Sequence, residues 1–131
     1  MSTSNSRAFG LSTITQIAIN AHDIDRATEF YRDKLGMKYL FSAPPGLAFF
    51  DCAGVRLMVS VPSSPEFDHP SSILYFNVED IQKAHATLLE RGVEFIEPPA
   101  FVVNMGSYDL WIASFRDSEN NVLALMSDVP H

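Results

Sequence analysis

The chain has 131 residues, a mass of 14.6 kDa and a formal net charge of −7. Hydrophobic residues make up 47% of the chain and charged residues 19%, so it can bury a core. Its nine Lys and Arg residues form no basic run, which excludes general binding to nucleic acid and argues against binding to anionic lipid. No segment approaches the ~20 apolar residues of a membrane span. The acidic balance is compatible with a neutral or cationic small ligand.

The cysteine content and the N-terminal residues bear on the cellular compartment. Cys52 is the single cysteine, so neither an internal disulfide nor a multi-thiolate zinc site can form. We expect Cys52 to serve as a small buried hydrophobe. Residues 1–12 begin with a polar stretch and lack the apolar region of a signal peptide. We interpret them as a disordered or extended tail and expect a cytoplasmic protein.

The first half of the chain predicts a strand, a helix and three further strands. Alternating β-branched residues favour a strand over 13–20. Asp23 is suited to cap a helix that ends before Gly36. Turn signals at Pro44-Pro45-Gly46 and Gly54 separate the remaining strands. These strands are expected at residues 38–42, 47–52 and 55–61.

The second half predicts the same order of elements. Residues 62–72 are rich in Pro and Ser and are interpreted as a linker. A strand over 73–78 follows, and Asp80 then caps a helix that ends at Gly92. The closing strands are expected at residues 93–97, 110–116 and 121–127.

The two halves are an internal repeat. Residues 16–24 align with residues 73–81 at an offset of 57, and residues 55–60 align with residues 122–127 at an offset of 67. Three pairs in the first alignment are identical: Asn20 and Asn77, Asp23 and Asp80, Ile24 and Ile81. Neither half alone has enough residues to bury a core well.

This repeat predicts an α+β fold in one domain. Two βαβββ modules, residues 13–61 and residues 73–127, are expected to form a curved mixed sheet around a cleft. The helices would cover the outer face and leave the inner face open. Concave sheet faces of this kind are natural sites for small molecules.

Three segments carry a resemblance to a known family. Residues 14–19, 23–36 and 115–125 resemble the vicinal oxygen chelate superfamily, which includes glyoxalase I, methylmalonyl-CoA epimerase, the extradiol dioxygenases and the bleomycin and fosfomycin resistance proteins. The resemblance covers nearly the whole chain. In the closing motif, Ser118 and Asn120 replace the usual Pro and Gly. Enzymes of this family use a divalent metal to polarise two neighbouring substrate oxygens.

The resemblance implies four metal-ligand positions, typically His, Glu or Gln, on pseudo-symmetric strands. The repeat assigns them to Gln16, Leu57, Ile73 and Ala124. Only Gln16 has a donor atom, whereas a catalytic divalent ion needs about three protein ligands. A one-residue error in the alignment would place Arg56 or Met58 at the second position. Neither residue would restore a set of metal ligands. We therefore predict neither a metal nor another cofactor, and we assign no catalytic residue.

A ligand-binding cleft is the better-supported prediction. Strand alternation places Tyr75 on the same face as Ile73. Residues 104–109 form a long segment that is expected to fold as a lid over the cleft. Aromatic and Met side chains suit a planar or apolar organic ligand, although ordinary packing is the alternative for each one. The predicted ligand-binding residues are Gln16, Phe49, Leu57, Ile73, Tyr75, Met105, Tyr108, Trp111 and Ala124.

The predicted function is metal-independent binding of a small apolar or aromatic molecule. A homodimer is expected, because the family commonly completes its clefts across a subunit interface. The first alternative is a metal-dependent lyase, isomerase or dioxygenase whose ligands occupy non-standard positions, with Gln16, Glu66 and His69 as candidates. The second is an interaction domain whose cleft is filled by its own side chains. No glycine-rich phosphate loop or Gly-x-Ser-x-Gly elbow is present.

Overall fold

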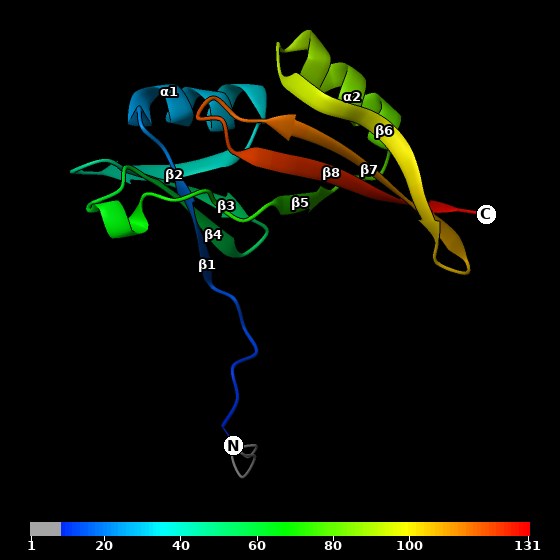
Figure 1. The fold of residues 1–131 in the computed structure, drawn as a ribbon, viewed down its shortest axis with the longest axis horizontal. Helices are drawn as coiled ribbons and strands as arrows, with labels where there is room; N and C mark the ends of the chain where they lie inside the picture. Colours follow the sequence, from blue (N-terminus) through cyan, green and yellow to red (C-terminus); the bar gives the residue numbers. More distant parts are fainter. Residues whose placement is uncertain (1–8) are drawn as a thin grey trace.

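The structure, a computed structural model, describes residues 9–131 and contains two successive modules (Figure 1). Each module has one strand, one helical segment and three further strands, and each forms its own four-stranded mixed sheet. The predicted α+β fold with two βαβββ modules is therefore confirmed. Residues 1–8 of the predicted tail lie outside the described residues. Within residues 9–131, no helix is long and apolar enough to cross a membrane.

Module 1 forms sheet 1, with the strand order β1-β4-β3-β2. Strands β1 and β4 are parallel, and the other neighbours are antiparallel. As predicted, Asp23 caps the helix, because its carboxylate accepts a hydrogen bond from the Arg26 amide at 3.0 Å. The elements are β1 (Gln16–Asn20), α1 (Ile24–Glu29), a π-helical turn η1 (Phe30–Lys34), β2 (Lys38–Ala43), β3 (Leu47–Cys52) and β4 (Val55–Ser60).

Module 2 forms sheet 2, with the equivalent order β5-β8-β7-β6. Strands β5 and β8 are again parallel. Asp80 caps the second helix by accepting from the Lys83 amide at 3.1 Å. The elements are β5 (Leu74–Asn77), α2 (Ile81–Glu90), β6 (Glu94–Asn104), β7 (Tyr108–Arg116) and β8 (Val122–Pro130). The linker before β5 contains one short 3-10 turn, η2 (Pro65–Phe67).

Strand β6 corrects two sequence-based expectations. It runs through Pro98 and Pro99 to Asn104, where the sequence predicted a strand ending at residue 97. Proline is tolerated here because β6 is an edge strand and pairs with a neighbour, β7, on one side only. The missing N–H groups therefore cost no hydrogen bonds to a second neighbouring strand. The predicted lid is wrong: β6 and β7 form a hairpin, closed by the hydrogen bond from the Met105 amide to the Tyr108 carbonyl at 2.8 Å. The few residues of this turn are too short to cover a cleft.

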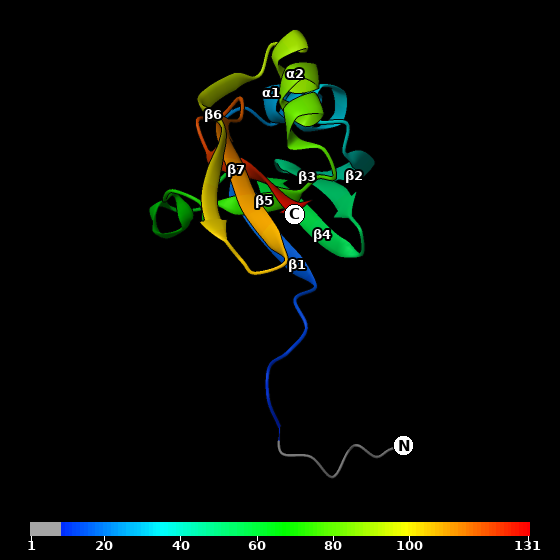
Figure 2. The ribbon, with the colours of Figure 1, turned by 90° about the vertical axis from the view of Figure 1, so that its right-hand side faces the viewer.

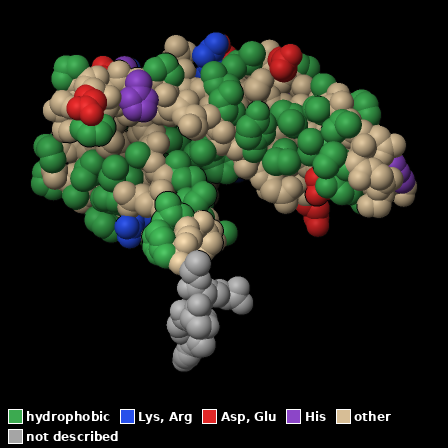
Figure 3. Space-filling model, turned by 60° about the horizontal axis from the view of Figure 1, so that its bottom comes forward, with side chains coloured by type: hydrophobic (Ala, Val, Ile, Leu, Met, Phe, Trp, Pro, Cys, Tyr) green, Lys and Arg blue, Asp and Glu red, His purple; other side chains and the backbone are tan. Residues whose placement is uncertain are grey.

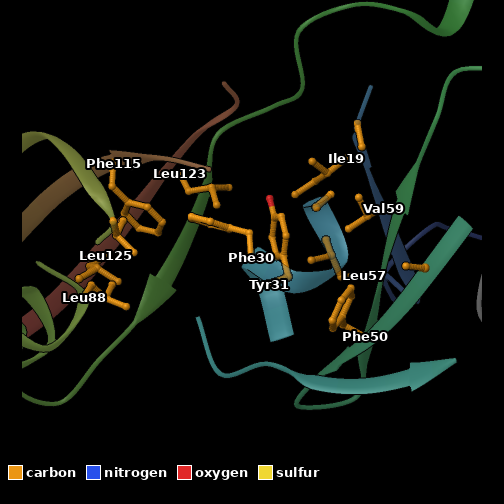
Figure 4. Packing of buried hydrophobic residues seen from close by; sticks show 14 of the residues in the cluster. Ile19, Phe30, Tyr31, Phe50, Leu57, Val59, Leu88, Phe115, Leu123 and Leu125 are labelled. Atoms are coloured by element: carbon orange, nitrogen blue, oxygen red, sulfur yellow. The ribbon is translucent and has the colours of Figure 1, made fainter. Parts of the chain in front are cut away.

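Both helices lie on the same side of the two sheets (Figures 1 and 2). The core lies between the helices and the sheets. Tyr31 is fully buried, and its ring lies 5.6 Å from that of Phe30 in an edge-to-face arrangement. Phe30 points from module 1 toward Phe115 and Leu123 of module 2 (Figure 4). One apolar cluster thus joins the two modules.

Polar groups near residues 117–121 also join the modules, and we call Asp117, Glu119 and Asn121 the inter-module latch. The buried hydroxyl of Tyr31 donates to Asp117 Oδ2 at 2.6 Å. Asn121 Nδ2 donates to the same oxygen and to the carbonyl of Asn20, each at 2.8 Å. Burial, together with the neighbouring Asp117, raises the pKa of Tyr31 well above its usual value, so the phenol stays protonated and acts as the donor.

Glu119 makes the strongest contacts of the latch. Arg26 donates to its carboxylate through Nε at 2.7 Å and through a terminal nitrogen at 3.0 Å. The backbone amides of His22 and Asp23 donate to the same carboxylate at 2.8 and 2.9 Å. Burial alone would raise the pKa of Glu119, but these hydrogen bonds and one from Ser118 outweigh burial and lower the pKa to about 2.

Candidate functional site

Strand alternation gives sheet 1 two chemically different faces. Ile19, Phe50 and Val59 face the helices and belong to the core. The opposite side, here called the open face of sheet 1, carries side chains that the strand register arranges in three rows. From β2 to β1 the rows are Lys38, Asp51, Arg56 and Gln16; then Phe41, Phe49, Met58 and Ala18; then Ala43, Leu47, Ser60 and Asn20. The middle row is wholly apolar.

The register corrects one predicted site residue. Leu57 is only 2% exposed and packs in the core, so its side chain does not share a face with Gln16. Ala18 pairs with Met58 between β1 and β4, as Tyr75 pairs with Ala124 between β5 and β8. The offset between equivalent residues of β4 and β8 is therefore 66, one less than the 67 of the sequence alignment. Met58 takes the place of Leu57 among the four pseudo-symmetric positions.

These four positions do not fit a divalent metal. They hold Gln16, Met58, Ile73 and Ala124, so the side-chain donors are one amide and one thioether. The amide oxygen of Gln16 already accepts a hydrogen bond from Arg56 at 2.6 Å. Within residues 9–131, no group of three or more His, Cys, Asp or Glu side chains is placed to hold a metal ion. Hard divalent ions require more oxygen or nitrogen ligands than these positions offer.

Arg56 is the central polar group of the open face. Its Nε donates to Gln16, and its guanidinium carbon lies 5.8 Å from the centre of the Phe49 ring. Phe49 in turn stacks on Phe41, with ring centres 4.7 Å apart. Gln16 Nε2 lies 3.6 Å from Met58 Sδ. A cation, an amide and an aromatic pair are thus held together next to the apolar middle row.

The linker lies over one end of the open face and forms the wall of a cavity. Asn20 positions it: the side-chain amide donates to the carbonyls of Phe67 and His69 at 3.0 and 2.6 Å, and the backbone amide donates to Ser71 Oγ at 3.0 Å. The cavity is partly open to solvent and has a volume of about 620 Å³. Its walls include Ala18, Asn20, Leu47, Met58 and Ser60 from the sheet, with Phe67, His69, Pro70 and Ser71 from the linker.

The weak metal-ligand candidates do not come together. His69 lines this cavity, and its Nδ1 lies 3.1 Å from the Pro70 carbonyl. Glu66 lies in η2, is exposed, and does not line the cavity. Gln16 lies two residues before the nearest cavity-lining residue of the open face on its strand. These three side chains therefore form no common site.

Sheet 2 has its own open face. Tyr75, half-exposed at 52%, pairs with Ala124, and both lie on the side of their strands opposite Leu74 and Leu123. Ala124 itself is only 1% exposed, so Tyr75 is the accessible member of this pair. Ile73 precedes β5 and is 47% exposed. Trp111 shares the helix-facing side with Ala113 and packs against the core, so it does not lie beside Tyr75.

The remaining predicted ligand residues lie at the β6–β7 hairpin. Met105 is half-exposed in the turn, and Tyr108 begins β7. Both are separated along the strand from the pair formed by Tyr75 and Ala124. The structure thus brings together Gln16 with Phe49 and Tyr75 with Ala124, and Leu57 and Tyr75 line a common cavity at the seam between the modules. It separates Trp111, Met105 and Tyr108 from these groups. Arg56, Met58 and Asn20 are site residues that the sequence reasoning did not select.

The underside of the molecule shows hydrophobic side chains over both modules (Figure 3). Two further cavities, of about 480 and 570 Å³, lie along the seam between the modules. Both are lined by Met37 of module 1 and Phe76 of module 2. Several of their walls are core side chains, such as Leu57 and Leu125. We interpret them as incompletely filled packing between modules.

Two βαβββ modules with both helices on one side and open sheet faces on the other define a paired-module class of α+β fold. The model of one family, the Glyoxalase/Bleomycin resistance protein/Dioxygenase superfamily, matches residues 13–125. The chain therefore belongs to this superfamily. No curated protein matches the chain.

Solved structures of similar architecture agree with this assignment. A superfamily member from Sphaerobacter thermophilus has a TM-score of 0.74 and 22% identity, covering 89% of this chain and 98% of that one. A lactoylglutathione lyase from Agrobacterium tumefaciens has a TM-score of 0.71 and 20% identity, covering 89% and 94%. A glyoxalase/bleomycin resistance protein/dioxygenase from Nocardioides has a TM-score of 0.69 and 24% identity, covering 96% and 89%. At these identities the likeness shows the fold alone.

Proposed function

We propose that the protein binds a small apolar or aromatic molecule on the open face of sheet 1 without a metal ion. The observation that carries this proposal is the apolar middle row beside a cavity of about 620 Å³. A ligand of drug-like size fits such a volume and gains most of its affinity from apolar contact. The few polar groups, Gln16, Arg56 and Asn20, would fix its orientation.

We further propose that a second copy of the chain completes the site. The open faces expose large apolar side chains such as Phe41 and Tyr75, each at 52%. The segment before β1 adds Phe9, Leu11 and Ile14, which are 89%, 92% and 67% exposed. Apolar surface of this extent is typical of a subunit interface. Analytical ultracentrifugation tests this part, and a monomer at micromolar concentration would contradict it. A cytoplasmic location remains part of the proposal.

A thermal-shift screen of small organic molecules tests binding, because a ligand of the folded state raises the melting temperature. Ala18→Phe would fill the cavity wall from β1, while Ala86→Phe adds the same ring to the exposed side of α2 and is the matched control. Compounds that stabilise the wild type and Ala86→Phe, but not Ala18→Phe, support the site. Equal stabilisation of both variants would contradict it.

Metal analysis of the purified protein separates this proposal from the enzymatic alternative. Stoichiometric, tightly bound metal, with activity restored by nickel, zinc, manganese or iron(II), would overturn metal-independent binding. The alternative of a cleft filled by its own side chains predicts no stabilising compound at all. The cavity beside Met58 supports binding over that alternative.

A further inference from the structure

We propose that the ligand is an aromatic or apolar acid and that Arg56 binds its anionic group. This inference rests on the proposed function and names the chemical class of the ligand. Arg56 has two possible partners, an acid across the strands or an anionic ligand. The contacts of Arg56 favour the ligand.

Arg56 makes no ion pair within the described part of the chain. The ion pairs there involve Arg26 and Arg32 among the arginines, but not Arg56. Its cross-strand neighbour on β3 is Asp51. That carboxylate instead accepts a hydrogen bond from the Gly54 amide at 3.1 Å, in the turn between β3 and β4. Arg56 is therefore an exposed cation that makes no direct ion pair with its neighbour Asp51.

The guanidinium is nevertheless held in place. Its Nε is used by Gln16, and its plane lies near the ring of Phe49. The two terminal nitrogens make no hydrogen bond to another described side chain or backbone group. Two parallel N–H groups on a fixed guanidinium match the two oxygens of a carboxylate, sulfonate or phosphate.

The surface next to Arg56 defines the rest of the ligand. Residues two apart on a strand are separated by about 7 Å, so the middle row begins one ring width from the guanidinium. Phe49 and Met58 occupy that row, and the cavity continues beyond Met58 toward Asn20. A molecule with its anion on Arg56 and a planar body over Phe49 and Met58 follows this arrangement. The net charge of −7 belongs to the whole chain, and screening over about 8 Å at physiological salt weakens the repulsion that distant carboxylates exert on an anionic ligand.

Two probes of nearly equal shape isolate the anionic contact. 2-Naphthoate carries a carboxylate, and 2-naphthamide replaces it with a neutral amide. Isothermal titration of the full chain should show at least tenfold tighter binding of naphthoate. Arg56→Met keeps an apolar stem but removes the guanidinium, so the affinities of this variant for naphthoate and naphthamide should become nearly equal.

Arg32→Met is the matched control, since it removes the same charge from the π-helical turn, where Arg32 pairs with Asp33. It should retain the preference for naphthoate. If Arg56→Met also keeps the preference, or if both probes bind the wild type equally, the assignment of Arg56 is overturned while the binding function stands. If neither probe binds at millimolar concentration, the aromatic-acid class is overturned, and the thermal-shift screen then decides the proposed function separately. Circular dichroism of each variant confirms that the fold is retained.

Discussion

Replacing Glu119 by Gln tests the inter-module latch. The side chain of Glu119 is 1% exposed, and its carboxylate accepts hydrogen bonds from Arg26, from Ser118 and from two backbone amides. Glutamine preserves the size of the side chain but removes its negative charge and one acceptor oxygen. We expect the variant to fold and to be less stable at neutral pH.

The magnitude follows from the pKa of Glu119. A fall from the ordinary value of 4.5 to about 2, at about 1.4 kcal/mol per pKa unit, corresponds to at most about 3.5 kcal/mol of stabilisation. Because the pKa is lower in the folded state than in the unfolded one, this stabilisation is fully present above pH 4.5. It is lost as the pH falls through about 2. Glu119→Gln should therefore be destabilised by about 2–3 kcal/mol at pH 7 and by much less near pH 2.

Urea denaturation followed by circular dichroism, repeated between pH 7 and pH 2.5, measures both quantities. Glu66→Gln is the control, because Glu66 is an exposed carboxylate outside the latch. Its stability difference from the wild type should stay below about 0.5 kcal/mol throughout. The reasoning is refuted if Glu119→Gln costs no more than this control, or if its cost is the same at pH 7 and pH 2.5.

Three further outcomes are expected. Tyr31→Phe should lower the free energy of unfolding by about 1–3 kcal/mol, measured by urea denaturation, because it leaves buried Asp117 without one donor. Leu57→Ala should cost about 2–5 kcal/mol by the same assay, since Leu57 is a core side chain, and should change naphthamide affinity little. Met58→Ala should show the reverse, with a smaller stability loss and at least a threefold loss of naphthamide affinity in titration calorimetry. Equal effects at Leu57 and Met58 would contradict the assigned register.

Local signals in the sequence predicted most of the fold. Asp23 and Asp80 mark the helix starts because their carboxylates cap the first amides, and the structure shows both hydrogen bonds. The repeat predicted that the modules share one architecture. Strand β6 was missed beyond residue 97, since Pro98 and Pro99 are usually strand breakers. Only the tertiary structure reveals that this strand lies at an edge, where the missing donors are harmless.

The candidate site was harder to predict, because a strand's side chains alternate with a period of two. A one-residue error in the repeat alignment assigns the site position to Leu57 when the equivalent residue is Met58. The two side chains point to opposite faces of the sheet. Weak similarity between two short apolar strands cannot fix that register, whereas the parallel pairing of Ala18 with Met58 does. The role of Arg56 could not be predicted either. The sequence does not reveal that Asp51, its cross-strand neighbour, accepts a hydrogen bond from the Gly54 amide and forms no ion pair with Arg56.

Asn20 connects the latch to the proposed binding site. Its carbonyl accepts from Asn121, its backbone amide donates to Ser71, and its side chain donates to two linker carbonyls. The contact that joins the modules therefore also fixes the linker that walls the cavity. The repeat places the identical Asn77 at the equivalent position in module 2, where it lies on β5. Among the described residues, Asn20 makes these contacts with the linker, and the cavity that the linker walls therefore lies on sheet 1, beside Met58.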